Sequence, residues 1–413
     1  MKVYVLPSGQ RIPPFLDAMD EVQILGRDLS AYRAEELGAL GHELVSSPPR
    51  DEDYLCVSDR TWFTRGLIRR FVDQARAPAR LQNRHPRWLE LNAALQDLEQ
   101  PGLYEIALLP AGSEPGFDVP AAEIELDFEE QAPPRGHPAM AHAMPEAIPV
   151  SDAGVHQLDH WSHILRVNWL AMTCTIQREQ RKFRGWGWVR HIWGVLWLLL
   201  KARSLNRYGL AKALTSKGVD CDIHPTALVE ASVLGDRVSV GPYAVVRGSV
   251  LGDDSIVGGK AIVNASVLGA GAKVERRGTA ILCVLYPGAF LSPGWGHQAS
   301  ILGREAFVAW SAMFYDLSFA APIKVMHRGH RVSTGQHFLG VAIGHRAKVG
   351  GRVELGYGSE VPNDQLLVGA AHDVLRVWEE GEGPHRVEDG VARPVGRRRS
   401  RPISAEGSTD DEE

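Results

Sequence analysis

The stretch KVMHRGHRVSTGQHF, residues 324–338, gathers three histidines and two arginines in a short span. The histidines are His327, His330 and His337. Histidine can take a proton from an accepting hydroxyl or amine because its pKa lies near neutrality. Their spacing matches a metal cluster only weakly, so the stretch is either a general-base site or a solvated polar loop. We take the three as candidate catalytic residues.

A second histidine group lies within VHQLDHWSHILRVNWLAMTCTI, residues 155–176. His156, His160 and His163 have the three-and-four spacing that places side chains on one face of a helix. Such a face could ligate a metal. Two tryptophans and a leucine share the same segment, however, and this favours a packed helix with polar edges.

The elements that carry these residues follow from a repeat. SVLGD begins at Ser232 and again at Ser249, and related pentapeptides begin at Ser266, Cys283 and Ser300, always seventeen residues apart. A fixed short period indicates a stacked, repetitive architecture. Aliphatic residues recur within it at spacings of six, six and five, which fits neither a helical stripe nor one long strand. They are Leu234, Val240, Val246, Leu251, Val257, Val263, Leu268 and Val274.

These spacings predict short strands joined by tight corners, with three faces closing each coil and one aliphatic side chain per face pointing inward. Glycines often follow the aliphatic residues, and we expect them to supply the backbone angles of the corners. His297, within PGWGHQAS, falls in an inward slot. We expect the neighbouring glycines to shift the register there, so that His297 lies outside the column or is hydrogen-bonded.

Residues 217–368, with CDIHPTALVEASVLGDRVSVGPYAVV near their start, resemble the hexapeptide-repeat family of left-handed parallel β-helices. The resemblance implies the left-handed coil and a homotrimer. In acyltransferases of this family a loop histidine acts as general base, and acyl-CoA binds in a groove between coils. His330 or a neighbouring histidine would take that role here.

The first 150 residues alternate strand and helix. MKVYVLPSGQR opens with an apolar strand and a Ser-Gly turn, a helix is predicted near 31–40, and DYLCVSD forms a second strand that ends at Asp59. This order predicts an α/β sheet whose ligands lie beyond the carboxyl ends of the strands. Residues 7–10 and Asp59 are therefore the expected ligand positions.

This order of elements resembles the sugar-phosphate nucleotidyltransferases, which have a Rossmann-like α/β fold. The resemblance implies that Gly9 belongs to the nucleotide-phosphate turn, that Arg11 binds phosphate, and that Asp59 is a Mg²⁺ ligand, with Asp127 as a second carboxylate. The turn has one glycine where the family has several, and DEVQI lacks the lysine of the family's Pro-Lys pair. These departures predict a diverged domain and leave its activity open.

The composition is that of a soluble globular chain of two or three domains: 413 residues, 44% apolar and 23% charged. The formal net charge of −5 gives no overall attraction to nucleic acid, so no nucleic-acid partner is expected. Four widely separated cysteines and an N-terminus without a secretory signal favour the cytoplasm.

Residues 151–216 are predicted to be helices that link the two domains. From 178 to 207 there are eight Lys or Arg residues, one acid and several tryptophans, and the longest apolar run, 192–200, is too short to span a bilayer. This segment is either a helix at the inner membrane face or a cap on the open end of the β-helix. A short β extension is expected at 369–393 and a disordered tail at 394–413.

Three functions remain open from the sequence. The first is a transferase of sugar-nucleotide or cell-envelope metabolism that binds a nucleotide sugar or sugar phosphate with Mg²⁺. The second is a β-helix acyltransferase that uses acyl-CoA. The third is a non-catalytic oligomeric or membrane-surface scaffold. The sequence favours the two-domain transferase architecture and leaves activity undecided.

Overall fold

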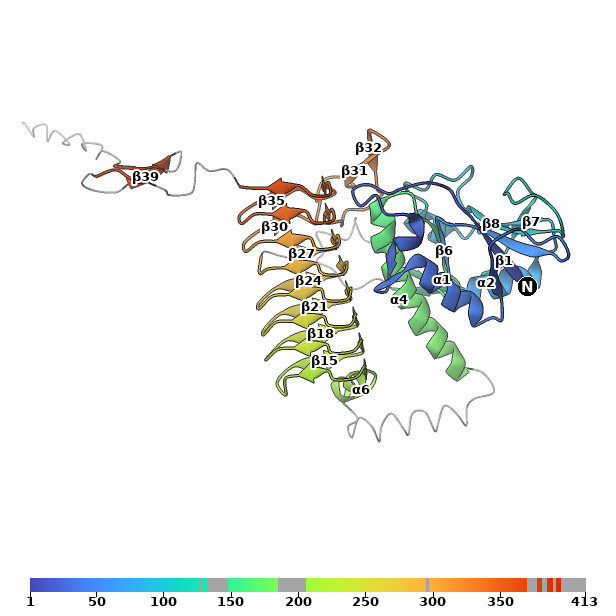
Figure 1. Ribbon diagram of the computed structural model, residues 1–413, viewed down its shortest axis with the longest axis horizontal. Helices are drawn as coiled ribbons and strands as arrows, with labels where there is room; N and C mark the ends of the chain where they lie inside the picture. The colour runs from blue at the N-terminus through green and yellow to red at the C-terminus, as the bar shows by residue number, and fades with distance from the viewer. Residues whose placement is uncertain are drawn as a thin grey trace, which may run out of the picture. The chain divides into compact units, whose positions relative to one another are not determined.

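The computed structural model describes residues 1–126, 128–132, 148–184, 206–294, 297–369, 377–380, 385–388 and 391–394. The chain divides into two compact units, Met1–Leu367 and Val368–Glu413. The larger unit holds an α/β region and a stack of parallel strands (Figure 1). The α/β region and the parallel β-helix expected from the sequence are thus confirmed at this level.

The α/β region is built on a six-stranded sheet in the order β4-β1-β5-β8-β7-β9. Strand β1 pairs in parallel with β4 and β5, whereas β8 is antiparallel to β5 and β7, so the sheet is mixed. The strands are β1 (Lys2–Leu6), β4 (Glu43–Val45), β5 (Tyr54–Ser58), β7 (Ala79–Gln82), β8 (Leu103–Leu109) and β9 (Ala121–Glu123).

Helices and short strand pairs surround this sheet. The amphipathic α2 buries its apolar side chains, among them Leu67 and Phe71, in the same cluster as Val3 and Val57 of the sheet. The elements are η1 (Met19–Glu21), α1 (Leu29–Gly38), α2 (Arg65–Gln74), α3 (Pro86–Asn92) and the pairs β2 (Gln23–Ile24) with β3 (Arg27–Asp28), β6 (Thr61–Phe63) with β12 (Val155–Gln157), and β10 (Glu129–Gln131) with β11 (Ile148–Val150).

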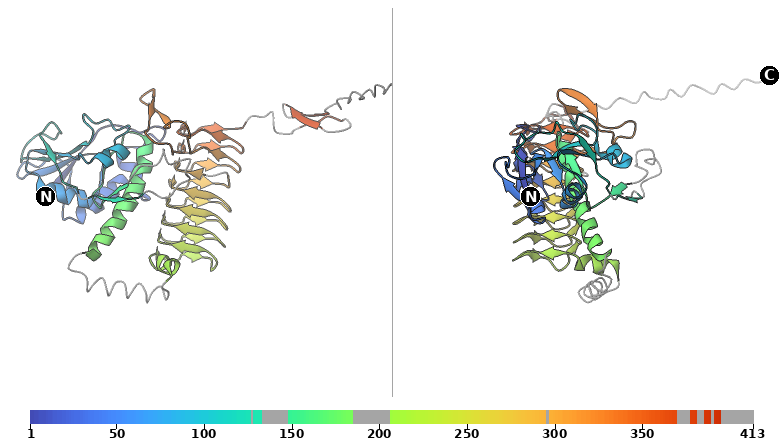
Figure 2. Two further views of the ribbon diagram at one scale, coloured as in Figure 1. Left: turned by 180° about the vertical axis from the view of Figure 1, so that it is seen from behind. Right: turned by 90° about the vertical axis from the view of Figure 1, so that its right-hand side faces the viewer.

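The β-helix has three faces, each a ladder of very short parallel strands (Figures 1 and 2). The first face contains β13 (Ser216–Lys217), β16 (Val233–Leu234), β19 (Val250–Leu251), β22 (Val267–Leu268), β25 (Val284–Leu285), β28 (Ile301–Leu302), β33 (Ala342–Ile343) and β36 (Glu360–Val361). The second contains β14 (Asp222–Ile223), β17 (Ser239–Val240), β20 (Ile256–Val257), β23 (Lys273–Val274), β26 (Phe290–Leu291), β29 (Phe307–Val308), β34 (Lys348–Val349) and β37 (Leu366–Leu367). The third contains β15 (Leu228–Glu230), β18 (Val245–Arg247), β21 (Ile262–Asn264), β24 (Thr279–Ile281) and β27 (His297–Gln298).

The aliphatic column predicted from the spacing is present. All eight aliphatic residues named above are buried, and they belong to one cluster. Val240 pairs with Val257, which pairs in turn with Val274, so each inward side chain lies over its counterpart in the next coil. The period of seventeen is therefore the length of one coil, and this prediction is confirmed.

The role predicted for the glycines is wrong. The corner positions with left-handed backbone angles are taken mostly by other residues, such as Arg237, Asp254 and Lys260, with φ values of 54°, 58° and 61°. Gly258 does not have a positive φ. A Cβ atom there would lie 2.5 Å from the backbone nitrogen of Arg276 in the next coil. Glycine is needed at this position because neighbouring coils approach too closely for a side chain.

The serine that begins each pentapeptide has its own structural role. The backbone N–H of Ser249 donates to the hydroxyl of Ser232, that of Ser266 donates to Ser249, and that of Cys283 donates to Ser266. These hydroxyls run up one buried corner and satisfy backbone N–H groups that the strands leave unpaired. The repeated serine is thus a hydrogen-bonding ladder parallel to the aliphatic column.

One coil is lengthened by an excursion that carries the histidine-rich stretch. Ile301 pairs with Ala342 instead of a residue seventeen positions on, and the intervening chain forms β30 (Met313–Phe314), which pairs with β35 (Glu354–Leu355), and a hairpin of β31 (Lys324–His327) and β32 (His330–Ser333). Arg328 and Gly329 form the hairpin turn, both with positive φ, as a type I′ turn requires.

Helix α4 (Trp161–Arg184) lies between the sheet region and the β-helix (Figure 2). Asn168 donates to the carbonyl of Gln23 and accepts from the N–H of Leu25, and the Trp169 indole donates to the carbonyl of Leu282. Helix α6 (Arg207–Ala213) contacts β15 of the first complete coil. Residues 185–205, which hold the tryptophan-rich run proposed for membrane contact or capping, lie outside the described residues.

The smaller unit contains a three-stranded sheet in the order β38-β40-β39, formed by Val377–Trp378, His385–Glu388 and Val391–Pro394. These strands lie in the stretch where a β extension was expected, apart from Pro394. Residues 395–413, which make up nearly all of the predicted disordered tail, lie outside the described residues. Among the described helices, none combines the length and apolarity needed to cross a bilayer.

Candidate functional site

Gly9, Arg11 and Asp59 follow the parallel strands β1 and β5 at the same edge of the sheet. The backbone N–H of Asp59 donates to the carbonyl of Leu6 at 3.0 Å, which holds the two strand ends together. Gly9 has a φ of +68°, and no atom lies within 4 Å of the position that a Cβ atom would occupy. The Arg11 guanidinium is exposed and donates to the carbonyl of Leu16 at 2.6 Å.

Asp59 has one carboxylate oxygen that fits a metal ligand. Its Oδ1 atom is buried and has no hydrogen-bond partner, while its backbone carbonyl accepts from the buried Arg33 guanidinium at 2.7 Å. Mg²⁺ often takes one or two carboxylates and completes its shell with water and substrate phosphate. Among the described residues no three His, Cys, Asp or Glu side chains form a metal cluster, and Asp127 is outside them. Within the described residues, the structure thus offers one buried carboxylate oxygen, that of Asp59, at the predicted metal position.

Arg11 and His327 line one cavity of about 270 Å³, which we name the junction pocket. It lies where the turn after β1, the loop after α3, the start of α4, the β31–β32 hairpin and one coil of the β-helix meet. Its lining residues are Gln10, Arg11, Pro13, Asp97, Asp159, His160, Met326, His327, Arg328 and Glu360. Two predicted site residues from distant parts of the chain thus share one polar cavity.

His327 is hydrogen-bonded to Asp97. The imidazole Nε2 lies 3.3 Å from Oδ1 of Asp97, and the ring is mostly buried. The Arg328 guanidinium lies 2.5 Å from the second carboxylate oxygen of Asp97. With Nε2 donating to the carboxylate, Nδ1 of His327 carries the free lone pair. A carboxylate that orients an imidazole in this way makes the opposite nitrogen a proton acceptor.

Asp97 is itself held by a buried charge network. Its backbone N–H donates to Oδ2 of Asp159 at 2.9 Å, and Oδ1 of Asp159 accepts from Arg60 at 2.5 Å. Arg60 also forms a two-pronged contact with Glu105 and donates to Gln10. The network therefore connects the loop that carries Asp97 to the sheet edge that carries Arg11.

The balance of burial and ion pairing shifts the pKa values of Asp159 and Glu105 in opposite directions. Burial raises the pKa of Asp159, and the charge of Arg60 only partly offsets it. Burial also acts to raise the pKa of Glu105, but hydrogen bonds and charge from Arg60 outweigh it, so that pKa is lowered. The charge of Arg60 thus offsets the free-energy cost of burying the carboxylates of Asp159 and Glu105.

His160 and Glu360 attach α4 to the β-helix at the pocket wall. The His160 ring lies 3.2 Å from the carbonyl of Met326 and 3.6 Å from Glu360, and its centroid is 5.7 Å from that of His327. The Trp161 indole donates to Glu360 at 3.0 Å. These contacts fix the hairpin that carries His327 against the start of α4.

The other two candidate catalytic histidines lie elsewhere. His330 is opposite His327 in the hairpin register, but its side chain is exposed and does not line the pocket. Nδ1 of His337 lies 2.9 Å from the carbonyl of Ser318, and His337 does not line the pocket either. The structure therefore separates the three histidines, and His327 alone joins Arg11.

The second histidine group is not arranged as one helical face. His156 belongs to strand β12, while His163 lies in the first turn of α4. Nδ1 of His163 accepts from the N–H of Asp159, and its Nε2 contacts the carbonyl of Ala94, so both ring nitrogens are occupied by backbone groups. Burial lowers the pKa of His163 and lowers that of His156 to about 3.

The expectation that His297 lies outside the column is wrong. Its side chain is completely buried, and it pairs with Ala280 on the third face, with its ring 4.6 Å from that of Phe314. Its nitrogens face the carbonyls of Thr279 and Ala312 without a hydrogen bond of standard geometry. Burial lowers its pKa to about 4. The column accepts the imidazole as a neutral aromatic ring.

Sequence reasoning missed Asp97, Asp159 and Glu360. Asp159 and His160 stand in a stretch whose pattern indicates either a packed helix with polar edges or a metal-ligating histidine face, and neither interpretation gives Asp159 a role. Asp97 lies in NAALQDLEQ, which has no recognisable motif, and Glu360 lies in the last coils of the repeat. Only the folded chain shows that Asp97 contacts His327, that Glu360 contacts His160 and that Asp159 holds the backbone of Asp97.

A scan against protein-family models finds no matching family, and a search of curated proteins finds no similar sequence. The nucleotidyltransferase and hexapeptide-repeat resemblances are therefore supported only by the coarse folds of the two regions.

Proposed function

We propose that the protein is a transferase that binds a nucleotide sugar or sugar phosphate in the junction pocket and uses His327 as a general base. The observation that carries this proposal is the meeting of Arg11 and the His327–Asp97 pair in one cavity. An exposed guanidinium without a carboxylate partner among the described residues supplies a binding group for phosphate, and the imidazole supplies a proton acceptor.

Acyl transfer is the reaction that suits these groups best. A sugar hydroxyl or amine held near Nδ1 of His327 would lose its proton to the imidazole as its oxygen or nitrogen bonds to the acyl carbonyl carbon. The carbon–sulfur bond of an acyl-CoA donor then breaks, and the thiolate takes the proton from His327. Asp97 would orient the imidazole and stabilise its protonated form. Arg11 would hold the phosphate of the acceptor.

Asp59 favours a second candidate, Mg²⁺-dependent nucleotidyl transfer. Its buried Oδ1 lacks a partner and lies at the edge of the sheet that carries the Gly9 turn. Mg²⁺ bound there would neutralise charge on a nucleoside triphosphate. The chain has no lysine in the segment that corresponds to the family's Pro-Lys pair, so we rank this activity second.

Thermal-shift titrations would distinguish the candidates. A ligand at about 100 times its dissociation constant adds about 2.7 kcal/mol to the free energy of unfolding. We expect stabilisation by a nucleotide sugar or sugar 1-phosphate that Arg11→Ala abolishes and Arg69→Ala, a control at an exposed arginine on α2, retains. Stabilisation by a triphosphate that needs Mg²⁺ and Asp59 would favour nucleotidyl transfer instead. If none of these ligands stabilises the protein, the non-catalytic scaffold is the remaining candidate.

Acyl transfer itself is tested with acetyl-CoA and the stabilising sugar, by following release of the free thiol. His327→Gln should reduce the rate at least a hundredfold, within the range typical of general-base removal. His330→Gln, in the same hairpin but outside the pocket, should keep it. Equal rates in the two variants would rule out His327 as the base.

Assembly and location are separate proposals. The β-helix resemblance implies a homotrimer, which sedimentation equilibrium would test directly. We also propose a cytoplasmic protein that contacts the inner membrane face through residues 178–207. Co-sedimentation with anionic vesicles, lost when 185–205 are replaced by a Gly/Ser linker, would support that contact.

A further inference from the structure

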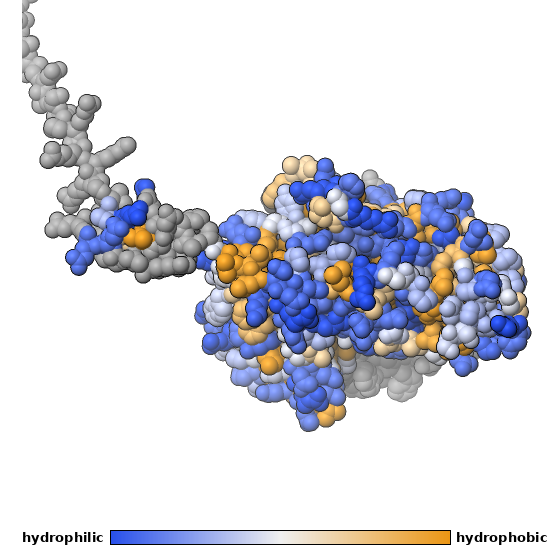
Figure 3. Space-filling view, turned by 45° about the horizontal axis from the view of Figure 1, so that its top comes forward, coloured by the Kyte–Doolittle hydropathy of each residue, from blue (hydrophilic) through white to orange (hydrophobic). Residues whose placement is uncertain are grey.

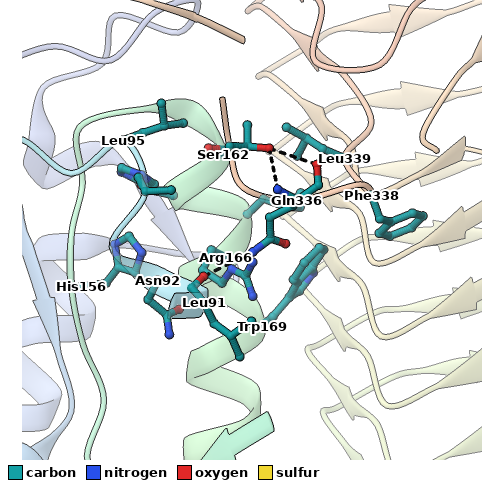
Figure 4. A pocket seen from close by; sticks show the side chains of 14 residues that line it. Leu91, Asn92, Leu95, His156, Ser162, Arg166, Trp169, Gln336, Phe338 and Leu339 are labelled. Carbon is teal, nitrogen blue, oxygen red and sulfur yellow. Dashed lines mark hydrogen bonds between the residues drawn. The ribbon is translucent and has the colours of Figure 1, made fainter. Parts of the chain in front are cut away.

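A second cavity lies against α4 (Figure 4). It is small, about 40 Å³, and is lined by the end of α3 and the loop after it, by α4 and by the chain that returns from the β31–β32 hairpin. The carbonyl of Leu91 accepts from the Gln336 side chain at 3.3 Å, which joins two of these walls. We name this cavity the Arg166 pocket.

Arg166 carries an uncompensated charge in this cavity. Its guanidinium is partly buried, and no carboxylate or hydrogen-bond acceptor among the described residues pairs with it. The guanidinium carbon of Arg166 lies 5.8 Å from the ring centroid of Trp169. Burial lowers its pKa to about 10, and no neighbouring acid opposes this effect. An arginine is normally paired with an anion when it is removed from water.

A second polar group without a complete set of hydrogen bonds points to a ligand. Asn92, which is only 5% exposed, lines the same cavity, and its Oδ1 has no hydrogen-bond partner although its Nδ2 donates to the carbonyl of Trp88. His156 and His163 also line the cavity and are neutral at pH 7, because burial lowers the pKa of each. The pocket therefore presents one positive charge and one unfilled acceptor.

We propose that the Arg166 pocket binds a small oxyanion that carries a hydroxyl group, such as hydrogen phosphate or a short hydroxycarboxylate. The anionic oxygens would accept from the Arg166 guanidinium, and the hydroxyl would donate to Oδ1 of Asn92. The volume holds only a few heavy atoms and excludes a nucleotide. This site is separate from the proposed transferase chemistry, since neither Arg166 nor Asn92 lines the junction pocket.

The site has a structural consequence for the hairpin. Gln336, Phe338 and Leu339, which follow the hairpin, form one wall of the Arg166 pocket, and α4 forms another (Figure 4). An anion bound between them would hold the excursion that carries His327 against α4. Binding should therefore raise the melting temperature of the full chain.

The test is a titration of the full chain with sodium phosphate and, separately, sodium glycolate, at constant ionic strength set with sodium chloride. Wild type should show a saturable rise in melting temperature with at least one of these anions. Arg166→Met should lose this response while melting no lower than wild type in chloride alone, since it removes an unpaired charge and keeps the side-chain volume. Arg69→Met, at the exposed arginine on α2, should respond as wild type does.

Two further variants keep the result interpretable. Asn92→Asp places a carboxylate in the same cavity and should also abolish the response, which covers the case in which Arg166→Met does not fold. Arg11→Ala removes the anion-binding group of the junction pocket and should keep the response. Loss of the response in Arg11→Ala would place the anion in the junction pocket and would contradict the proposal. A saturable response in both Arg166→Met and Asn92→Asp, or none in wild type, would overturn the proposal. The anion that gives the saturable rise in melting temperature shows which of the two, phosphate or glycolate, the pocket binds.

Discussion

Along the β-helix column, Val240, Val257 and Val274 lie over one another within one apolar cluster, whereas the α/β region buries Arg60 and Asp159 against Glu105. The first interior gains stability from many equivalent apolar contacts, each worth a similar amount. The second depends on a few charges that are stable only together. Single substitutions should therefore cause similar, moderate losses of stability along the column and a large loss in the charge network.

On the face of the molecule drawn in Figure 3, hydrophobic residues form separate patches among hydrophilic ones.

The largest effect is expected from Arg60→Met. The substitution leaves Asp159 and Glu105 without their cation, and breaking one partner of a buried pair costs about 3–5 kcal/mol. Urea unfolding followed by circular dichroism at pH 7 measures the loss. The triple variant Arg60→Met, Glu105→Gln, Asp159→Asn should recover most of it, because no buried charge remains. A loss below about 1 kcal/mol in the single variant would contradict the charge-network description.

Leu268→Ala should cost about 2–5 kcal/mol, the range for truncating a fully buried leucine. Leu268 pairs with Leu251 below and Leu285 above, so the cavity would open in the middle of the column. Ile262→Ala is the matched control, because Ile262 belongs to the adjacent strand β21 and is 41% exposed. Equal losses in the two variants would mean that the inward and outward positions have been misassigned.

The column could be predicted from sequence because one local rule repeats. Each inward residue meets a residue seventeen positions away, so spacing alone determines the contacts of Leu234, Val240 and their successors. The rule did not extend to backbone conformation. Glycine was assigned to the corner angles, but Arg237 and Asp254 adopt them, and Gly258 is required by the approach of the next coil.

The junction pocket could be predicted only in part. Arg11 and His327 were both candidates, but for different reasons and for different sites. His327 and Asp97 are 230 positions apart, and no pattern in the loop after α3 marks that acid. Their contact depends on how α4 and the hairpin pack together. Such packing follows from tertiary structure and has no local periodicity that a sequence could display.

His297, whose side chain is buried in the column, gives a pH-dependent prediction. His297 has a folded-state pKa of about 4, below the ordinary value of 6.5, so the unfolded chain binds a proton more readily. Its contribution to stability is complete above pH 6.5 and is lost as the pH falls toward 4. The shift corresponds to roughly 3 kcal/mol.

The measurement is the difference in unfolding free energy between wild type and His297→Leu at pH 7 and at pH 4.5. The leucine variant should be relatively more stable at the lower pH. The buried His156 and His163 are present in both proteins, so their protonation largely cancels. A difference that does not change with pH would show that His297 is already solvated or hydrogen-bonded in the folded state.

Arg237→Ala should have the smallest effect, although its pair has good geometry. The Arg237 guanidinium donates to both oxygens of Asp254, each at 2.7 Å, and the pair links two neighbouring coils. Both side chains are more than half exposed, so water and salt screen the interaction. Urea unfolding of the variant should be indistinguishable from wild type, and so should that of Arg346→Ala, which removes a similar exposed pair with Asp364. Arg237 and Arg60 each form two-pronged contacts with acids, and they differ chiefly in burial. If Arg237→Ala approached the loss expected for Arg60→Met, pairing geometry would outweigh burial, and the proposed difference between the two regions would be wrong.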